Sequence, residues 1–142
     1  MAEVTPPRSV LSERIVAKTF EGLSVHKITP ASPIAMFDSG VGGLSVFKEA
    51  VKQLPGEDII YFGDTARVPY GGRSPQEIVK FNYEIISFLV SLGAKMVIMA
   101  CGTSSAVAYP VVKDRYKIPI IPLVKPGAKA AVAASESGKI GL

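Results

Sequence analysis

The chain reads IAMFDSGVGGLSVFKEAVKQLPG over residues 34–56, and this stretch decides the fold. Its first four residues are apolar and end at Asp38, a pattern typical of a buried strand. A glycine-rich loop follows. Apolar residues then recur at three- and four-residue spacing from Leu44 to Leu54, which predicts a helix that a Pro-Gly pair stops. We therefore expect a strand, a tight loop and a helix.

The same succession recurs further along the chain. The later elements that we expect are, in order, a strand at 59–62, a helix at 75–92, a strand at 96–100, a helix at 104–116, a strand at 118–124 and a helix at 126–135. Ser74 and Glu77 can form a capping box around Pro75 at the start of the first of these helices. Gly93 can end it. Pro110 should bend or delay the second.

Strand and helix thus alternate four times, and the strands are continuous apolar runs, as in a sheet that is buried on both faces. This pattern predicts an α/β fold with a mostly parallel sheet sandwiched by helices. The closing residues 139–142 resemble the opening of a fifth strand, so we expect a domain that is cut there.

Composition narrows the class of protein. The chain has 142 residues, of which 48% are hydrophobic and 20% charged, which fits one globular domain and not a disordered chain. Its single cysteine excludes a disulfide-stapled scaffold. No apolar run approaches the about 20 residues of a membrane-spanning helix. The net charge is +4, but the basic residues are scattered, so we expect no nucleic-acid partner.

The chain divides into two parts by composition. Residues 1–33 are rich in Pro, Ser and Thr and include His26, the only histidine. We expect them to form a loosely ordered extension without a secretory signal. Residues 34–142 should form the α/β domain.

Small polar residues follow each of the four expected strands. They are Asp38-Ser39-Gly40, Gly63-Asp64-Thr65, Cys101-Gly102-Thr103-Ser104 and Lys125-Pro126-Gly127. Individually they are ordinary loop residues. Together they should meet at the carboxyl edge of the sheet, where α/β proteins bind ligands. The loop at 40–43 matches neither the dinucleotide fingerprint nor a P-loop, so we expect a small ligand with a carboxylate.

Cys101 is the residue at this edge with the most chemistry to offer. It is either a buried core cysteine or a reactive one, and its place before a helix start favours the thiolate form. No histidine lies near it in the sequence, so a Cys–His acyl-transfer pair is not supported. No second soft ligand lies nearby either, so we expect no metal. One possible role is left, in which the thiol acts as a general base that removes a proton from carbon.

Three motifs resemble the N-terminal signatures of the glutamate racemase family. They are Asp38-Ser39-Gly40-Val41-Gly42-Gly43-Leu44-Ser45, Tyr61-Phe62-Gly63-Asp64-Thr65-Ala66-Arg67-Val68-Pro69-Tyr70-Gly71 and Ala100-Cys101-Gly102-Thr103-Ser104. The resemblance covers about residues 34–142. It implies the N-terminal lobe of a two-lobe fold. It also implies cytoplasmic, cofactor-free interconversion of L- and D-glutamate, which supplies D-glutamate for peptidoglycan.

The resemblance also implies roles for individual residues. Cys101 matches a cysteine that transfers a proton at the substrate Cα, and Asp38 matches the acid that assists it. The positions implied to bind glutamate are Ser39, Pro69, Tyr70, Gly71, Gly102 and Thr103. The family usually has Asn where this chain has Gly102, and its second catalytic cysteine would lie beyond Leu142.

Two alternatives stay open at this point. Two copies of the chain could form a homodimer that presents two Cys101 thiols across one cleft. Alternatively, the chain is a non-catalytic lobe that binds a small acid or a partner protein. Gly102 and the missing second half of the site favour this second alternative over the dimer.

Overall fold

The sheet consists of four parallel strands in the order β2-β1-β3-β4. In the computed structural model, which describes residues 27–141, they are β1 (Ile34–Asp38), β2 (Ile59–Gly63), β3 (Met96–Met99) and β4 (Ile120–Pro122). Ile34 of the central strand β1 pairs with Ile59 on one side and Met96 on the other. The expected α/β fold with a parallel sheet is confirmed. Most of the expected N-terminal extension, including His26, lies outside the described residues.

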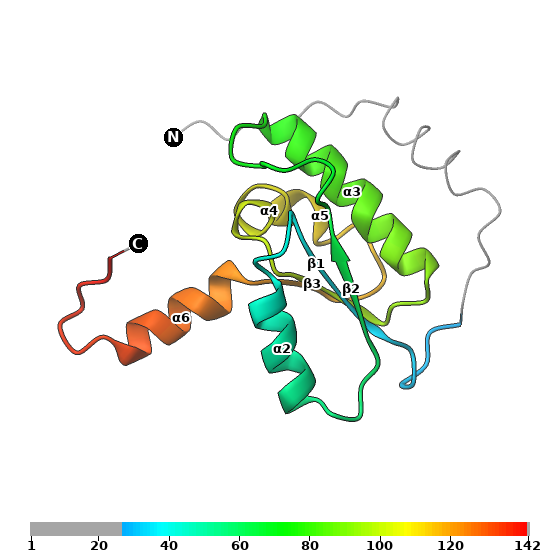
Figure 1. Cartoon of the computed structure of the whole chain (residues 1–142), viewed down its shortest axis with the longest axis horizontal. Helices are drawn as coiled ribbons and strands as arrows, with labels where there is room; N and C mark the ends of the chain where they lie inside the picture. The colour runs from blue at the N-terminus through cyan, green and yellow to red at the C-terminus, as the bar shows by residue number, and fades with distance from the viewer. Residues whose placement is uncertain (1–26, 142) are drawn as a thin grey trace.

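Three helices cover one face of the sheet (Figure 1): α3 (Pro75–Ser91), α4 (Gly102–Val107) and α5 (Tyr109–Val112). The core lies between them and the sheet, where Phe37 and Met99 are fully buried beneath Ile86 and Leu89 of α3. The capping box at the start of α3 is present as predicted. Among the described residues, no helix combines the length and apolar character needed to cross a membrane.

The opposite face of the sheet is covered by fewer buried side chains. Helix α2 (Leu44–Gln53) lies there, and its Phe47 packs edge-on against Tyr61 of β2 with ring centroids 5.7 Å apart. No residue of α2 is buried. Helix α6 (Val124–Ala134) leads away from the sheet, as Figure 1 shows, and none of its residues is buried either. The core is therefore one-sided.

The helix expected at 104–116 is instead two short helices that meet at Ala108. Pro110 lies in the first turn of α5, where its missing N–H leaves no hydrogen bond unmade. The expected effect of this proline is confirmed. The expected length was wrong, because α5 already ends at Val112.

Boundaries near the other prolines also differ from expectation. Strand β4 is shorter than the predicted 118–124, since Pro119, which has no N–H to donate, precedes it and helix α6 already begins at Val124 with Leu123 as its N-cap. Helix α6 begins at Val124, before Pro126, and a proline is tolerated in the first turn of a helix. Residues 139–141 form no strand, and Leu142 lies outside the described residues.

Candidate functional site

Three of the four predicted strand-end segments come together at one edge of the sheet. Asp38 ends β1 and stands opposite Gly63, the last residue of β2. The Asp64 N–H donates to the Asp38 carbonyl (2.9 Å), and the Ala100 N–H donates to the Phe37 carbonyl (2.8 Å). These bonds bring the residues that follow β1, β2 and β3 side by side.

The glycine-rich loop wraps around the carboxylate of Asp38, which is 7% exposed. The N–H groups of Gly40 and Gly43 both donate to Asp38 Oδ2, at 3.3 and 3.0 Å. A Cβ on Gly43 would lie 2.8 Å from that of Asp38, and 2.9 Å from both Ala100 Cβ and Tyr61 Oη. Only glycine fits at residue 43. The loop therefore holds a carboxylate of the chain itself, not a phosphate.

The thiol of Cys101 links the first and third motifs. Cys101 is 3% exposed and is the N-cap of α4, where its Sγ accepts the Ser104 N–H at 3.4 Å. The same sulfur donates to Ser39 Oγ at 3.5 Å. Burial raises the pKa of the nearby Tyr61 hydroxyl, and electrostatic interactions with Asp38 and Cys101 raise it further. The thiol and the Asp38 carboxylate thus share one site.

The loop from residue 64 to residue 73 forms the other wall. It contains a cis peptide bond between Val68 and Pro69. A Cβ built on Gly40 would lie 3.6 Å from Val68 Cγ2, so this loop lies against the glycine-rich loop. Pro69 is exposed. The second motif therefore borders the site that the first and third motifs form.

Tyr70 turns its ring inward from this loop. It is 3% exposed, and its hydroxyl donates to Asp64 Oδ2 at 2.5 Å. Burial and the hydrogen bond to Asp64 raise the pKa of Tyr70 far above its ordinary value. The hydroxyl thus donates to Asp64 and the Tyr70 carbonyl accepts the Arg73 N–H at 3.0 Å, whereas the neighbouring Gly71 is exposed.

Residues 102 and 103 form the first turn of α4. A Cβ on the exposed Gly102 would have no atom within 4 Å, and Thr103 is half-buried. The fourth predicted segment, around Lys125, lies in the exposed first turn of α6, which leads away from the sheet. In the described part of the chain, no three His, Cys, Asp or Glu side chains form a group that could hold a metal ion.

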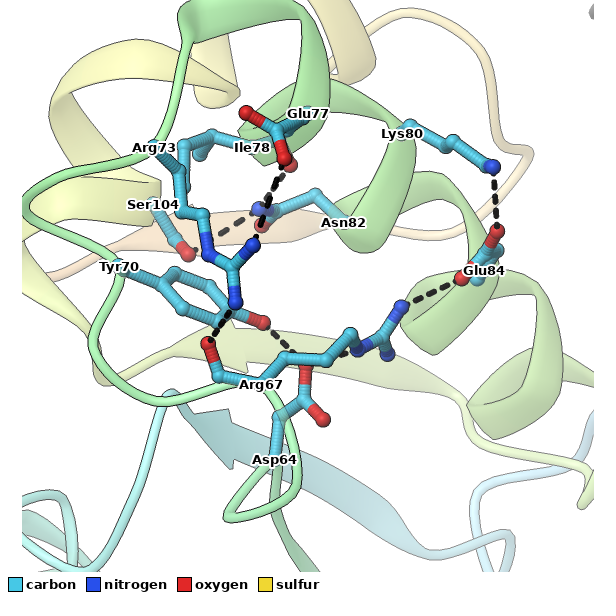
Figure 2. Close-up of polar contacts among 10 residues, drawn as sticks. All are labelled: Asp64, Arg67, Tyr70, Arg73, Glu77, Ile78, Lys80, Asn82, Glu84 and Ser104. Carbon is cyan, nitrogen blue, oxygen red and sulfur yellow. Dashed lines mark hydrogen bonds and ion pairs between the residues drawn. The ribbon is translucent and has the colours of Figure 1, made fainter.

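The sequence did not predict the side chains that bind and fix the residues of the site walls. Arg67 Nε lies 2.7 Å from Asp64 Oδ2, and Arg67 Nη1 lies 2.5 Å from Glu84 Oε2 of α3 (Figure 2). The guanidinium also lies 4.4 Å from the centre of the Phe81 ring. Arg67 lies inside the second motif, but no local pattern marks Glu84 as its partner.

A second connection runs from α3 to the start of α4. The buried Asn82 donates from Nδ2 to the Ile78 carbonyl at 2.7 Å and to Ser104 Oγ at 3.1 Å. Ser104 is the residue whose N–H contacts the Cys101 sulfur. Helix α3 therefore contacts the supports of both walls of the site.

Comparison with known proteins identifies relatives of one kind. No protein-family model matches the chain. The glutamate racemase of Geobacter metallireducens is 49% identical over 113 residues, which are 80% of this chain and 42% of that protein. That of Desulforudis audaxviator is 51% identical over 109 residues, 77% of this chain and 40% of that protein. The chain thus spans about two fifths of the length of these curated relatives.

Solved structures agree. Glutamate racemase from Thermus thermophilus, in complex with β-chloro-D-alanine, matches 74% of this chain and 41% of its own with a TM-score of 0.70 and 46% identity. The Francisella tularensis enzyme, in complex with D-glutamate, matches 70% of this chain and 38% of its own with a TM-score of 0.67 and 44% identity. Sequence and fold together confirm the resemblance: this chain is a homologue of part of the glutamate racemases, which are amino-acid isomerases.

Proposed function

We propose that this chain carries one half of a glutamate racemase site, in which Cys101 transfers a proton at Cα of glutamate. The observation that carries the proposal is the place of the thiol, at the carboxyl edge of the sheet and hydrogen-bonded to Ser39. The related Francisella enzyme was solved with D-glutamate and the Escherichia coli enzyme with L-glutamate. Both enantiomers are therefore the ligands to test.

In the proposed step the Cys101 thiolate takes the Cα proton. The C–H bond breaks, an S–H bond forms, and the electron pair stays on Cα, stabilised by the adjacent carboxylate of the substrate. Asp38 is the assisting acid, and two glycine N–H groups hold its carboxylate in place. No cofactor takes part.

The ligand contacts that we propose come from all three motifs. Ser39 and Thr103 offer hydroxyl groups, and Gly102 offers an open position beside the thiol. The loop offers Pro69 as a wall, and the N–H of Tyr70 and the backbone of Gly71 as hydrogen-bonding groups. The Tyr70 hydroxyl already donates to Asp64, and its carbonyl already accepts the Arg73 N–H.

Inversion needs a second acid on the opposite face of Cα, and one thiol serves one face only. The chain has a single cysteine, so we propose that the second group comes from outside these 142 residues, either from further chain or from a second copy in a homodimer. A single base can still exchange the Cα proton with solvent while configuration is retained.

This difference defines the experiment. L- and D-glutamate are incubated separately with the purified chain in heavy water, and proton NMR follows the Cα signal. We expect exchange in one enantiomer, without inversion, and its loss in Cys101→Ala. Exchange with inversion in both enantiomers would indicate the homodimer. If calorimetry shows that neither enantiomer binds, the proposed substrate is refuted.

A second candidate is a lobe that binds a small acid without turnover. The open position at Gly102 favours it, because the family resemblance places an amide side chain there and this chain has none. Glutamate binding without Cα exchange, unchanged in Cys101→Ser, would establish this candidate in place of the first.

We further propose a cytoplasmic location and a role in supplying D-glutamate for peptidoglycan. Both proposals rest on the family resemblance. The test is growth of a bacterial strain that requires external D-glutamate, with the gene for the native protein supplied on a plasmid. Growth that needs Cys101 would support the role, and absence of growth with expressed, folded protein would contradict it.

A further inference from the structure

Arg67 makes one contact inside the loop at 64–73 and two contacts to helix α3, and Figure 2 draws the ion pairs to Asp64 and Glu84. Its Nε binds Asp64 at 2.7 Å, its Nη1 binds Glu84 at 2.5 Å, and its guanidinium lies 4.4 Å from the centre of the Phe81 ring. The Arg67 side chain is 27% exposed, so these contacts are partly shielded from water. The same loop also contacts α3 through the Tyr70 ring, which packs against Phe81, and through the ion pair between Arg73 and Glu77. Arg67 is the side chain that joins Asp64 of the loop to Glu84 of the helix.

The geometry requires a guanidinium. A planar fork of donors can bind two carboxylates at different angles while its face stacks on an aromatic ring, whereas an ammonium is a single point of charge. Burial lowers the pKa of Arg67, but the hydrogen bonds to Asp64 and Glu84 outweigh it and the pKa is raised. The guanidinium of Arg67 therefore keeps its positive charge throughout the ordinary pH range.

Asp64 connects Arg67 to Tyr70. The oxygen that binds Arg67, Oδ2, also accepts the Tyr70 hydroxyl. The loop then closes on itself, because the Arg73 N–H donates to the Tyr70 carbonyl at 3.0 Å and Arg73 Nη2 donates to the Arg67 carbonyl at 3.4 Å. The Tyr70 backbone is thus fixed from both ends of the loop.

We infer that Arg67 is a positioning residue, which holds the Tyr70-Gly71 backbone in place for the substrate by fixing the loop to Glu84. The inference rests on the proposed function for the identity of the ligand. It does not rest on it for the effect on the loop, which is measurable without any ligand. In this inference Arg67 acts through the loop and not by contact with the substrate.

Two variants and one matched control test the inference. Arg67→Lys keeps the charge but loses the fork, and Glu84→Gln keeps the shape of the α3 partner but loses its charge. Lys80→Met is the control, because Lys80 Nζ lies 4.0 Å from the other oxygen of the same Glu84 carboxylate and does not contact the loop. If the loop depended on any ion pair of Glu84, and not on the one with Arg67, all three variants would change the loop alike.

Amide hydrogen exchange at Arg73 is the first readout, since that N–H bonds to Tyr70 inside the loop. We expect exchange to speed up at least tenfold in Arg67→Lys and Glu84→Gln, and to stay unchanged in Lys80→Met. The amide of Gly43, in the other loop, should keep its rate in all of them. Equal acceleration at Gly43 and Arg73 would show general destabilisation and overturn the inference.

Glutamate affinity, measured by calorimetry on the same samples, is the second readout. If the wild-type chain binds glutamate, the dissociation constant should rise about tenfold in Arg67→Lys and in Glu84→Gln at an unchanged melting temperature. Faster amide exchange at Arg73 with an unchanged dissociation constant for glutamate would overturn the positioning role. If the wild-type chain does not bind glutamate, the proposed function fails, and exchange at Arg73 alone decides whether Arg67 fixes the loop.

Discussion

Helices α3 and α2 pack on opposite faces of the same sheet, yet five side chains of α3 are buried and none of α2 is. The apolar contacts that stabilise the fold therefore lie mainly on the α3 face. The side chains that support both walls of the candidate site, Glu84 and Asn82, belong to the same helix. One helix thus serves stability and site geometry together, and the α2 face contributes little to either.

The largest effect should come from truncating the buried face of α3. Leu89 is fully buried, so Leu89→Ala should lower the free energy of unfolding by about 2–5 kcal/mol through lost contacts and a residual cavity. Val51 of α2 is 44% exposed, and Val51→Ala should cost about 1 kcal/mol or less. Urea unfolding measures both. Equal losses would show that the two faces are equally important.

A smaller loss should follow from adding one carbon atom at Gly43. Its Cβ would lie within 2.9 Å of three atoms of Asp38, Ala100 and Tyr61, so Gly43→Ala should cost about 1–3 kcal/mol. Gly102→Ala is the matched control, because its Cβ would meet nothing within 4 Å. Thermal unfolding of the two variants should separate them by several degrees. A harmless Gly43→Ala would contradict the tight loop around Asp38.

The open position at Gly102 allows a substitution that should strengthen ligand binding. Gly102→Asn adds the amide that the family resemblance implies, and one further hydrogen bond to glutamate is worth about 1–1.5 kcal/mol. The dissociation constant for glutamate should therefore fall about tenfold in calorimetry. Gly72→Asn, at another glycine with no atom within 4 Å, is the control and should leave affinity unchanged. Weaker binding in Gly102→Asn would show that the position does not face the ligand.

The smallest effect concerns the start of α3 and depends on pH. Hydrogen bonds from the Ser74 backbone and hydroxyl, with a contribution from Arg73, lower the pKa of Glu77 below its ordinary value of 4.5. Since the pKa is depressed in the folded state, ionised Glu77 stabilises the fold above pH 4.5, and this stability is lost as the pH falls through the lowered value. The difference in melting temperature between wild type and Glu77→Gln should therefore shrink in acid. A difference that grows in acid would contradict the capping box.

Elements with strong local signals could be predicted closely from the sequence. Strand β1 and helix α3 match their predicted positions within one residue, because an unbroken apolar run marks the strand and a capping box and a glycine mark the ends of the helix. Around Pro110 and Pro126 the boundaries were wrong. A proline there is accommodated in the first turn of a helix, and which turn becomes the first depends on tertiary packing.

The candidate site divides in the same way. Asp38 and Cys101 could be predicted to meet, because parallel strands place their carboxyl ends at one edge. The bridge between Arg67 and Glu84 joins residues 17 positions apart on a loop and a helix, and no sequence pattern encodes such a contact. The same holds for Asn82 and Ser104, which are 22 positions apart. Local patterns predict elements, whereas side-chain contacts between elements require the fold.

The sulfur of Cys101 has one further consequence as the cap of α4. The atom that we propose to carry the proton is the atom that accepts the Ser104 N–H, so each change in the charge on sulfur alters that hydrogen bond. The amide proton of Ser104 is therefore a built-in indicator of the thiol. Its chemical shift follows protonation, alkylation or oxidation of Cys101, and reports the state of the site without a substrate, a label or a turnover assay.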